Sequence, residues 1–228
     1  MNRRECLSVL FALTWASRVN AGGLDAITAS EAAQALRESL TRGAEAAITR
    51  LGRENGYFGN AKIKIGLPKK YDRADKLLRA LGQGKKVDDL VLAMNRAAEQ
   101  AVPKAQPLVL EAIKRMTLED AKAILKGGDD AATQYFRTQT EAPLAEAMLP
   151  VIKSVTEQSG LARAYNTLAR KLVQLAGLQS ERATVEDYVN KQAISGLYAL
   201  VAEEERALRA DPSRYAGGLI GKVFGLIH

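Results

Sequence analysis

Apolar residues recur every three or four positions along most of this chain, which is the spacing of the buried face of an α-helix. Between Leu36 and Leu51, for example, apolar side chains keep this spacing until Gly52 ends the run. Similar runs follow one another to about Ala210, separated by short segments that contain glycine, proline or polar residues. The pattern predicts an all-α fold, in which residues 22–228 form a single bundle of about eight to ten helices.

Residues 56–66 interrupt the helical pattern. Polar and apolar positions alternate from Lys62 to Ile65, as in a strand, but the sequence offers no second strand for pairing. We therefore expect a short extended arm or loop here. The helices resume at Pro68, which suits the first turn of a helix because that position needs no N–H donor.

Capping motifs mark the start of two later helices. Thr117 with Asp120, and Thr184 with Asp187, have the three-residue spacing of a capping box, in which side chains satisfy the free N–H groups of the first turn. The sequence therefore predicts helices that begin just after Thr117 and just after Thr184.

The longest central run, Val87 to Met116, predicts the helix around which the bundle is organised. Pro103 and Pro107 are expected to break or kink it, because proline lacks the N–H group that a helix interior uses. Residues 129–137, with Asp129 as the candidate N-cap, and residues 143–159 are predicted as two separate helices, since Pro143 begins the second.

Two polar groups interrupt the apolar stripes. Asn95, Arg96 and Glu99 lie on the central helix, where Arg96 and Glu99 are one turn apart and can form an ion pair. Tyr135 and Arg137 lie on a later helix. Either the two arginines bind the carboxylate or phosphate headgroup of a ligand whose tail lies among aliphatic helices, or the groups form a structural network. We favour the structural network.

Residues 1–21 have the features of a secretory signal peptide: Arg3 and Arg4, a short apolar core, and small residues up to Ala21. The apolar core is too short to cross a bilayer as a helix. The arginine pair suits the twin-arginine export route, and the general secretory route fits as well. We therefore expect a periplasmic protein, cleaved after Ala21.

Composition argues against several kinds of chemistry in the exported chain. The single histidine is the last residue, His228, and the single cysteine, Cys6, lies in the expected signal peptide. Zinc sites and histidine-dependent nucleophilic catalysis need such side chains at other positions. The glycine-rich segments lack the spacing of a phosphate-binding loop, and the pairs of acidic residues lack that of a calcium-binding loop. The sequence predicts a non-enzymatic protein without a cofactor or a metal.

The formal net charge of +7 is concentrated in residues 62–86, which hold nine Lys or Arg against two Asp. An exported protein meets phospholipid headgroups and other envelope anions, so we expect no nucleic-acid partner. Contact with a membrane surface is one interpretation of this segment, and a solvated basic face is the more common one.

The C-terminal segment, residues 213–228, is apolar and rich in glycine. Gly217, Gly221 and Gly225 are spaced four apart, which allows another helix to approach closely. Docking on the domain, self-association into a homo-oligomer, and contact with a membrane or an apolar ligand are all compatible with this composition.

Three groups of residues together resemble a known family. They are Met94–Glu99 (MNRAAE), residues 127–140 from Gly127 to Thr140, and residues 187–212 from Asp187 to Pro212. The combination is similar to the bacterial domain-of-unknown-function family 4197, over most of the chain after the signal peptide. The resemblance implies an exported helical domain, and it carries neither an activity nor catalytic residues.

Two functions fit the sequence. The first is a periplasmic binding or interaction protein that holds an apolar or amphipathic, lipid-like ligand in a cavity of a few hundred cubic ångströms, roughly the size of other small-molecule sites. The second is a self-associating structural or scaffolding protein of the cell envelope, with no small-molecule ligand. We favour the first.

Overall fold

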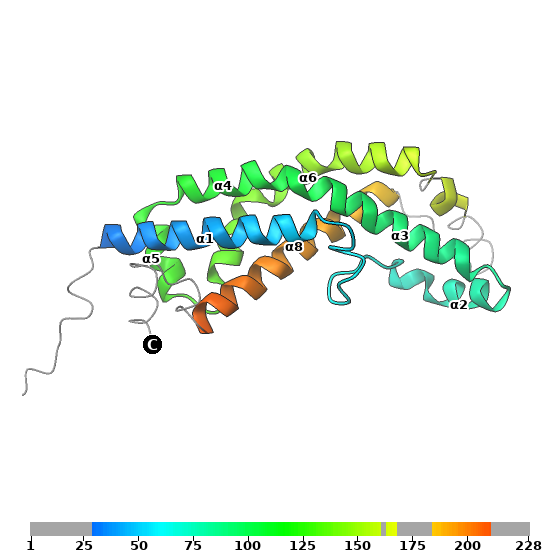
Figure 1. The fold of residues 1–228 in the computed structure, drawn as a ribbon, viewed down its shortest axis with the longest axis horizontal. Coiled ribbons are helices and arrows are strands. Elements are labelled where there is room, and N and C mark those ends of the chain that lie inside the picture. The colour runs from blue at the N-terminus through cyan, green and yellow to red at the C-terminus, as the bar shows by residue number, and fades with distance from the viewer. Residues whose placement is uncertain (1–28, 161–162, 168–183, 211–228) are drawn as a thin grey trace, which may run out of the picture.

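The computed structural model describes residues 29–160, 163–167 and 184–210, which form an elongated bundle of α-helices (Figure 1). No strand occurs in these ranges, so the predicted all-α class is confirmed. The expected signal peptide and the glycine-rich C-terminal segment lie outside the described residues. The α-helices with described bounds are α1 (Ala29–Leu51), α2 (Asp72–Ala80), α3 (Gly84–Ala101), α4 (Ala105–Arg115), α5 (Leu118–Lys126), α6 (Ala131–Gln158) and α8 (Val185–Ala210).

The predicted count of eight to ten is higher than the seven α-helices with described bounds, although residues 163–167 are also helical. The main reason is α6, a continuous helix that contains both Pro143 and Pro150. The sequence predicted two separate helices there, with a break before Pro143. Leu144 and Met148 are fully buried beside these prolines, so packing against neighbouring helices outweighs the local cost of proline.

The central run divides at the first of its two prolines. A short 3-10 turn, η2 (Val102–Lys104), contains Pro103 and joins α3 to α4. Pro107 causes no second break, because it lies in the first turn of α4, where the N–H groups have no partner within the helix. Figure 1 shows α3 and α4 following one another along the bundle.

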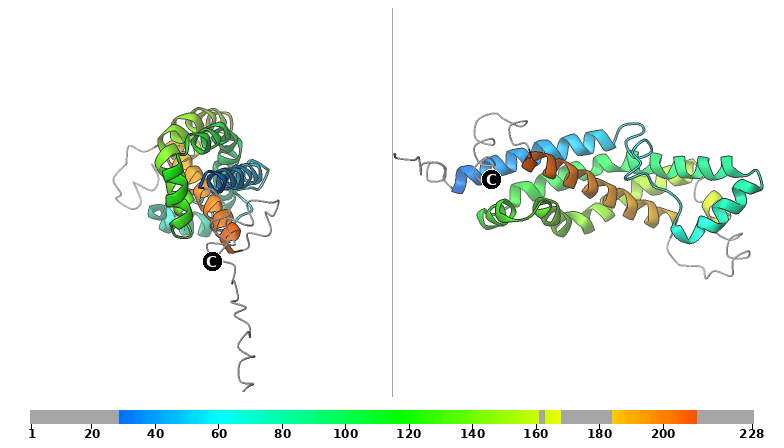
Figure 2. Two further views of the ribbon diagram at one scale, coloured as in Figure 1. Left: turned by 90° about the vertical axis from the view of Figure 1, so that its left-hand side faces the viewer. Right: turned by 90° about the horizontal axis from the view of Figure 1, so that it is seen from below.

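The last described helix packs among the earlier ones. α8 makes its most extensive contacts with α6 and also packs against α1 and α3. α1 in turn contacts α4 and α5, so the first and last described helices share one core (Figure 2). α2 lies at one end of the bundle, and α5 lies at the other (Figure 1).

Small side chains allow this close packing. Ala47, Ala97, Ala98, Ala105 and Ala193 have no exposed surface. Alanine lets helix backbones approach closely, and each helix then presents its larger aliphatic side chains between its neighbours. This arrangement agrees with the low aromatic content of 5%.

Both predicted capping boxes are present. The Thr117 and Asp120 side chains bond reciprocally to backbone N–H groups at the start of α5, and Thr184 with Asp187 does the same before α8. Asp129, by contrast, does not cap the next helix. The N-cap of α6 is Asp130, whose side chain makes no capping bond.

A glutamate from another helix caps α6 instead. Glu205 on α8 accepts hydrogen bonds from the backbone N–H groups of Ala132 and Thr133, each at 2.9 Å, and from the Thr133 hydroxyl at 2.8 Å. Arg209, one turn later on α8, pairs with Glu205 at 3.0 Å and also donates to the carbonyl of Ile124 near the end of α5. This junction joins α5, α6 and α8.

Candidate functional site

The predicted polar residues of α3 face the chain segment that follows α1. We call residues 52–66 the 52–66 loop; it is wound into turns rather than extended. Asn95 has no exposed surface. Its side-chain oxygen accepts from the N–H of Ile65 at 2.9 Å, and its nitrogen donates to the carbonyls of Ile65 and Val91 at 2.8 and 2.7 Å. All its polar atoms are therefore used within the protein.

Glu99 holds the other end of the same loop. One carboxylate oxygen accepts hydrogen bonds from the N–H groups of Tyr57 and Phe58, both at 3.1 Å. The other oxygen pairs with Arg96, which also donates to Glu54 and Asn55 at 3.1 and 2.9 Å. The carboxylate is buried, with only 4% of its side chain exposed, and these donors replace the water that it has lost.

The 52–66 loop is fastened to α8 as well. The hydroxyl of Tyr57 donates to the carbonyl of Ala193 at 2.7 Å, and that of Tyr188 donates to the carbonyl of Gly66 at 2.9 Å. Burial, together with the Glu99 carboxylate, raises the pKa of Tyr57 far above its usual value. The loop therefore lies between α3 and α8 and joins them.

Tyr135 and Arg137 belong to a different part of the bundle. Tyr135 donates to the carbonyl of Ala112 on α4 at 3.2 Å. The Arg137 guanidinium lies 4.7 Å from the ring centroid of Tyr198 on α8, and it approaches Glu141 at 3.9 Å. No described contact joins this pair to Asn95, Arg96 or Glu99. The three α3 residues thus hold the 52–66 loop, whereas Tyr135 contacts α4 and Arg137 contacts α8.

A groove lies elsewhere, at the α2 end of the bundle (Figure 1). Its volume is about 450 Å³ and its surface is predominantly apolar. We call it the α2–α3 groove. None of the five predicted residues lines it. Three parts of the chain line it. α2 contributes Leu78, and α3 with its N-cap contributes Gln83, Lys86, Val87, Asp89, Leu90 and Ala93. The chain after α6 contributes Ser159, Arg163, Ala164 and Thr167.

Two contacts hold the walls of the α2–α3 groove together. Arg79 on α2 donates to Asp75 and, across the turn, to Asp88 on α3, both at 2.7 Å. The hydrogen bond with Arg79 lowers the pKa of Asp88 below its ordinary value. On the other side, the ring of Tyr71 packs edge-on against that of Tyr165, with their centroids 5.9 Å apart.

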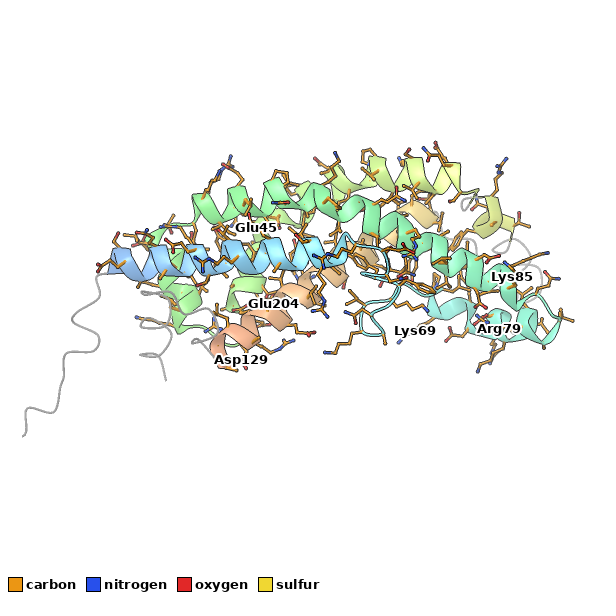
Figure 3. The ribbon with its side chains drawn as sticks, in the orientation of Figure 1. Glu45, Lys69, Arg79, Lys85, Asp129 and Glu204 are labelled. Atoms are coloured by element: carbon orange, nitrogen blue, oxygen red, sulfur yellow. The ribbon has the colours of Figure 1, made fainter. Side chains whose placement is uncertain are left out.

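The charges of the groove are unequal. Its one carboxylate, Asp89, forms an ion pair with Lys85 at 2.8 Å. Lys86 and Arg163 also line the groove, and neither forms an ion pair with another described residue. Figure 3 shows Arg79 and Lys85 at this end of the bundle, away from Asp129 and Glu204. The groove therefore combines an apolar floor with two available cations.

Sequence reasoning identified the apolar residues of this groove only as parts of helix stripes. Leu78, Val87 and Leu90 have the spacing of ordinary core positions. Nothing in that spacing distinguishes a residue that packs against another helix from one that lines an open groove. The segment around Arg163 comes together with α3 only in the folded chain, so residue spacing alone gave no sign of the site.

Two further properties concern the described residues alone. None of their helices combines the length and apolar character needed to cross a membrane. They also contain no group of three or more His, Cys, Asp or Glu side chains arranged to hold a metal ion.

Comparison with known proteins identifies a family. The family model described as "Protein of unknown function (DUF4197)" matches residues 26–225. The chain belongs to the DUF4197 family. No curated protein and no solved structure gives a significant match to it. The resemblance inferred from the sequence of this DUF4197 protein is therefore confirmed.

The motifs that carried the resemblance now have structural positions in the DUF4197 protein. Met94–Glu99 contains the α3 side chains that hold the 52–66 loop. Residues 127–140 contain Thr133, and residues 187–212 contain Glu205 and Arg209, so these two motifs meet at the start of α6. All three motifs thus supply residues that join elements distant in the sequence.

Proposed function

We propose that this protein is a non-enzymatic periplasmic binding protein whose α2–α3 groove holds an anionic amphipathic ligand, such as a single-chain lipid or fatty acid. The observation that carries the proposal is the combination of an apolar groove of about 450 Å³ with two cations that have no ion-pair partner among the described residues. Small-molecule sites generally have volumes of about 300–1,000 Å³ and few polar groups.

The chemistry of the groove suggests how such a ligand lies. An aliphatic tail against Leu78, Val87, Leu90 and Ala93 removes apolar surface from water, which contributes about 25 cal/mol for each Å² buried. A carboxylate or phosphate headgroup near Arg163 gains charge-assisted hydrogen bonds. The apolar surface supplies affinity, and the cations select a negatively charged head.

Filling the groove tests the proposal. Ala93 lines the α2–α3 groove, so Ala93→Trp places an indole where the tail is expected. We expect lipid that copurifies with the wild-type protein in native mass spectrometry to be absent from this variant. The matched control is Ala123→Trp, at an exposed position on α5, which should retain the lipid. Absence of bound lipid from the wild-type protein, together with no binding of added fatty acids, would contradict the proposal.

Removing one of the two groove cations, Arg163, tests the position of the headgroup. We expect Arg163→Gln to weaken the binding of a fluorescent fatty acid by roughly tenfold, because one charge-assisted contact is worth about 1.5 kcal/mol. Lys122→Gln removes an exposed cation from α5 and should leave the binding unchanged. If both variants bind as the wild type does, the head does not lie near Arg163.

The periplasmic part of the proposal has its own test. Expression of the full chain, followed by cell fractionation and N-terminal sequencing, should give a periplasmic protein that begins at Gly22. A cytoplasmic protein with an uncut N-terminus contradicts it. The alternative function, a self-associating scaffold, predicts instead a multimeric mass by light scattering that falls to the monomer in a chain ending at Asp211.

A further inference from the structure

α2 carries the two most exposed large apolar side chains of the described residues. Leu77 is 44% exposed and Leu81, its C-cap residue, is 65% exposed. The only other described large apolar residue in the exposed class is Leu118, at 39%, at the opposite end of the bundle. The neighbouring side of α2, about 100° from Leu77, packs on the bundle through Leu78, and Tyr71, just before the helix, is buried as well.

Cations accompany these leucines; of the two acidic residues of α2, Asp72 lies one turn before Lys76 and Asp75 lies on the far side of the helix from Leu77. Arg73, Leu77 and Leu81 are four residues apart and so lie along one side of the helix. Lys76 borders that side. At about 100° per residue, Asp72 and Asp75 lie roughly 140° and 160° away from Leu77. Asp75 is moreover paired with Arg79. We call Arg73, Lys76, Leu77 and Leu81 the α2 face.

We propose that the α2 face docks on the surface of an anionic phospholipid bilayer. Arg73 and Lys76 are exposed, and neither forms an ion pair with another described residue. Cations beside an anionic membrane contribute about 1 kcal/mol each, and leucines on the same side enter the boundary between headgroups and acyl chains. Because the charges of the α2 face are positive, we expect it to bind an anionic bilayer rather than a neutral one.

A second copy of the chain fits the α2 face less well. A stable protein interface buries about 800 Å² on each partner, whereas two partly exposed leucines on a nine-residue helix supply only a small part of that area. Two copies would also bring Arg73 and Lys76 near their own equivalents, where like charges repel. A lipid surface brings the opposite charge and needs no complementary shape.

Docking would bring a source of lipid to the α2–α3 groove, and this role rests on the proposed function. Leu78, next to Leu77, lines the α2–α3 groove, so a bilayer bound to the α2 face lies beside the groove. A single-chain lipid then has a short path between the bilayer and the groove. Docking itself depends only on the α2 face and is measured separately.

Vesicle binding tests the docking. The full chain, purified after export, is sedimented with vesicles of phosphatidylcholine that contain about one-third phosphatidylglycerol, and with vesicles of phosphatidylcholine alone. We expect binding to the anionic vesicles only, weakened at high salt because exposed charges are then screened. Arg73→Gln combined with Lys76→Gln should lower the partition coefficient roughly thirtyfold. Lys122→Gln with Lys126→Gln, on α5, is the matched control and should bind as the wild type does.

The contribution of the two leucines to vesicle binding is tested in the same way. Leu77→Ser with Leu81→Ser should lower the partition coefficient by at least about tenfold, because the apolar insertion is lost. Leu118→Ser, on the opposite end of the bundle, should have no effect. The replaced residues are exposed, so circular dichroism should show the wild-type helix content in all these variants.

Four outcomes overturn the proposal: no binding to anionic vesicles, equal binding to neutral vesicles, equal losses in the α2 and α5 variants, or a dimer that Leu77→Ser dissociates. The groove variant Ala93→Trp separates docking from ligand binding. We expect it to bind vesicles normally while lacking copurified lipid. Vesicle binding without any ligand supports docking and contradicts the proposed function, and the reverse result contradicts docking alone.

Discussion

The carboxylate of Glu205 on α8 accepts a hydrogen bond from the backbone N–H of Thr133 in the first turn of α6, at 2.9 Å. A negative charge at this position satisfies N–H groups that have no partner within the helix and interacts favourably with the helix dipole. Glu205 is only 5% exposed, and Arg209 balances its charge. A residue 72 positions later in the sequence thus completes the start of α6.

We expect Glu205→Gln to lower the free energy of unfolding by about 3 kcal/mol, because it removes the negative partner of the buried ion pair with Arg209. Glu146→Gln, an exposed position on α6, should change stability by less than about 0.5 kcal/mol. Urea unfolding followed by circular dichroism measures both. Equal stability of the two variants would show that the junction contributes little.

Asn95 offers a local test of the 52–66 loop. Asn95→Ala removes three hydrogen bonds and leaves the N–H and carbonyl of Ile65 without that partner. We expect a loss of about 2–3 kcal/mol, since buried polar groups without partners are costly. Hydrogen exchange of the Ile65 amide should become faster, whereas Gln100→Ala, at an exposed position on the same helix, should leave it unchanged.

Two helical glycines should respond to alanine with opposite signs. A Cβ at Gly196 on α8 would lie 2.7 Å from a ring carbon of Tyr57, so the ring must shift. We expect Gly196→Ala to destabilise the protein by about 2 kcal/mol. Gly43 on α1 has nothing within 4 Å of such a Cβ, and Gly43→Ala should stabilise by about 0.5–1 kcal/mol because alanine favours the helix. Thermal unfolding of both variants provides the comparison. If Gly196→Ala is as stable as Gly43→Ala, the Tyr57 contact is not tight.

The raised pKa of Tyr57 makes stability depend on pH in the alkaline range. Its folded pKa is raised above the unfolded value of about 10, so the contribution is fully present below pH 10 and is lost as the pH rises above it. The expected slope is about 1.4 kcal/mol per pH unit for this one group. Tyr57→Phe should remove this contribution to the slope of unfolding free energy against pH. It also removes the hydrogen bond to Ala193, which should lower the stability at neutral pH by about 1 kcal/mol. An unchanged alkaline slope in this variant would contradict the assignment.

The sequence correctly predicted those features of the fold that depend on residues close to one another in the chain. The capping boxes at Thr117 and Thr184, the end of α1 at Gly52 and the break at Pro103 all follow from interactions within a few residues. The pairing of Arg96 with Glu99 is equally local, because the two lie one turn apart.

Features that depend on packing could not be predicted in this way. α6 continues through Pro143 because its buried side chains are held by other helices. Asp129 does not cap α6, because Glu205 reaches that position from α8. The α2–α3 groove likewise needs segments about 75 residues apart, such as Ala93 and Thr167, to come together. Residue spacing within one segment contains no information about its contacts with segments that are distant in the sequence.

The position of α8 has a consequence for how the chain folds. α8 supplies the cap of α6, the carbonyl that receives Tyr57, and a packing surface for α1. During synthesis, the first 184 residues are made before any of these partners exists. An incomplete chain therefore exposes the apolar sides of α1 and α6 and leaves the 52–66 loop fastened on one side only. Folding to the final structure must await α8, and any cut that releases α8 removes the cap of α6 and the packing surface of α1.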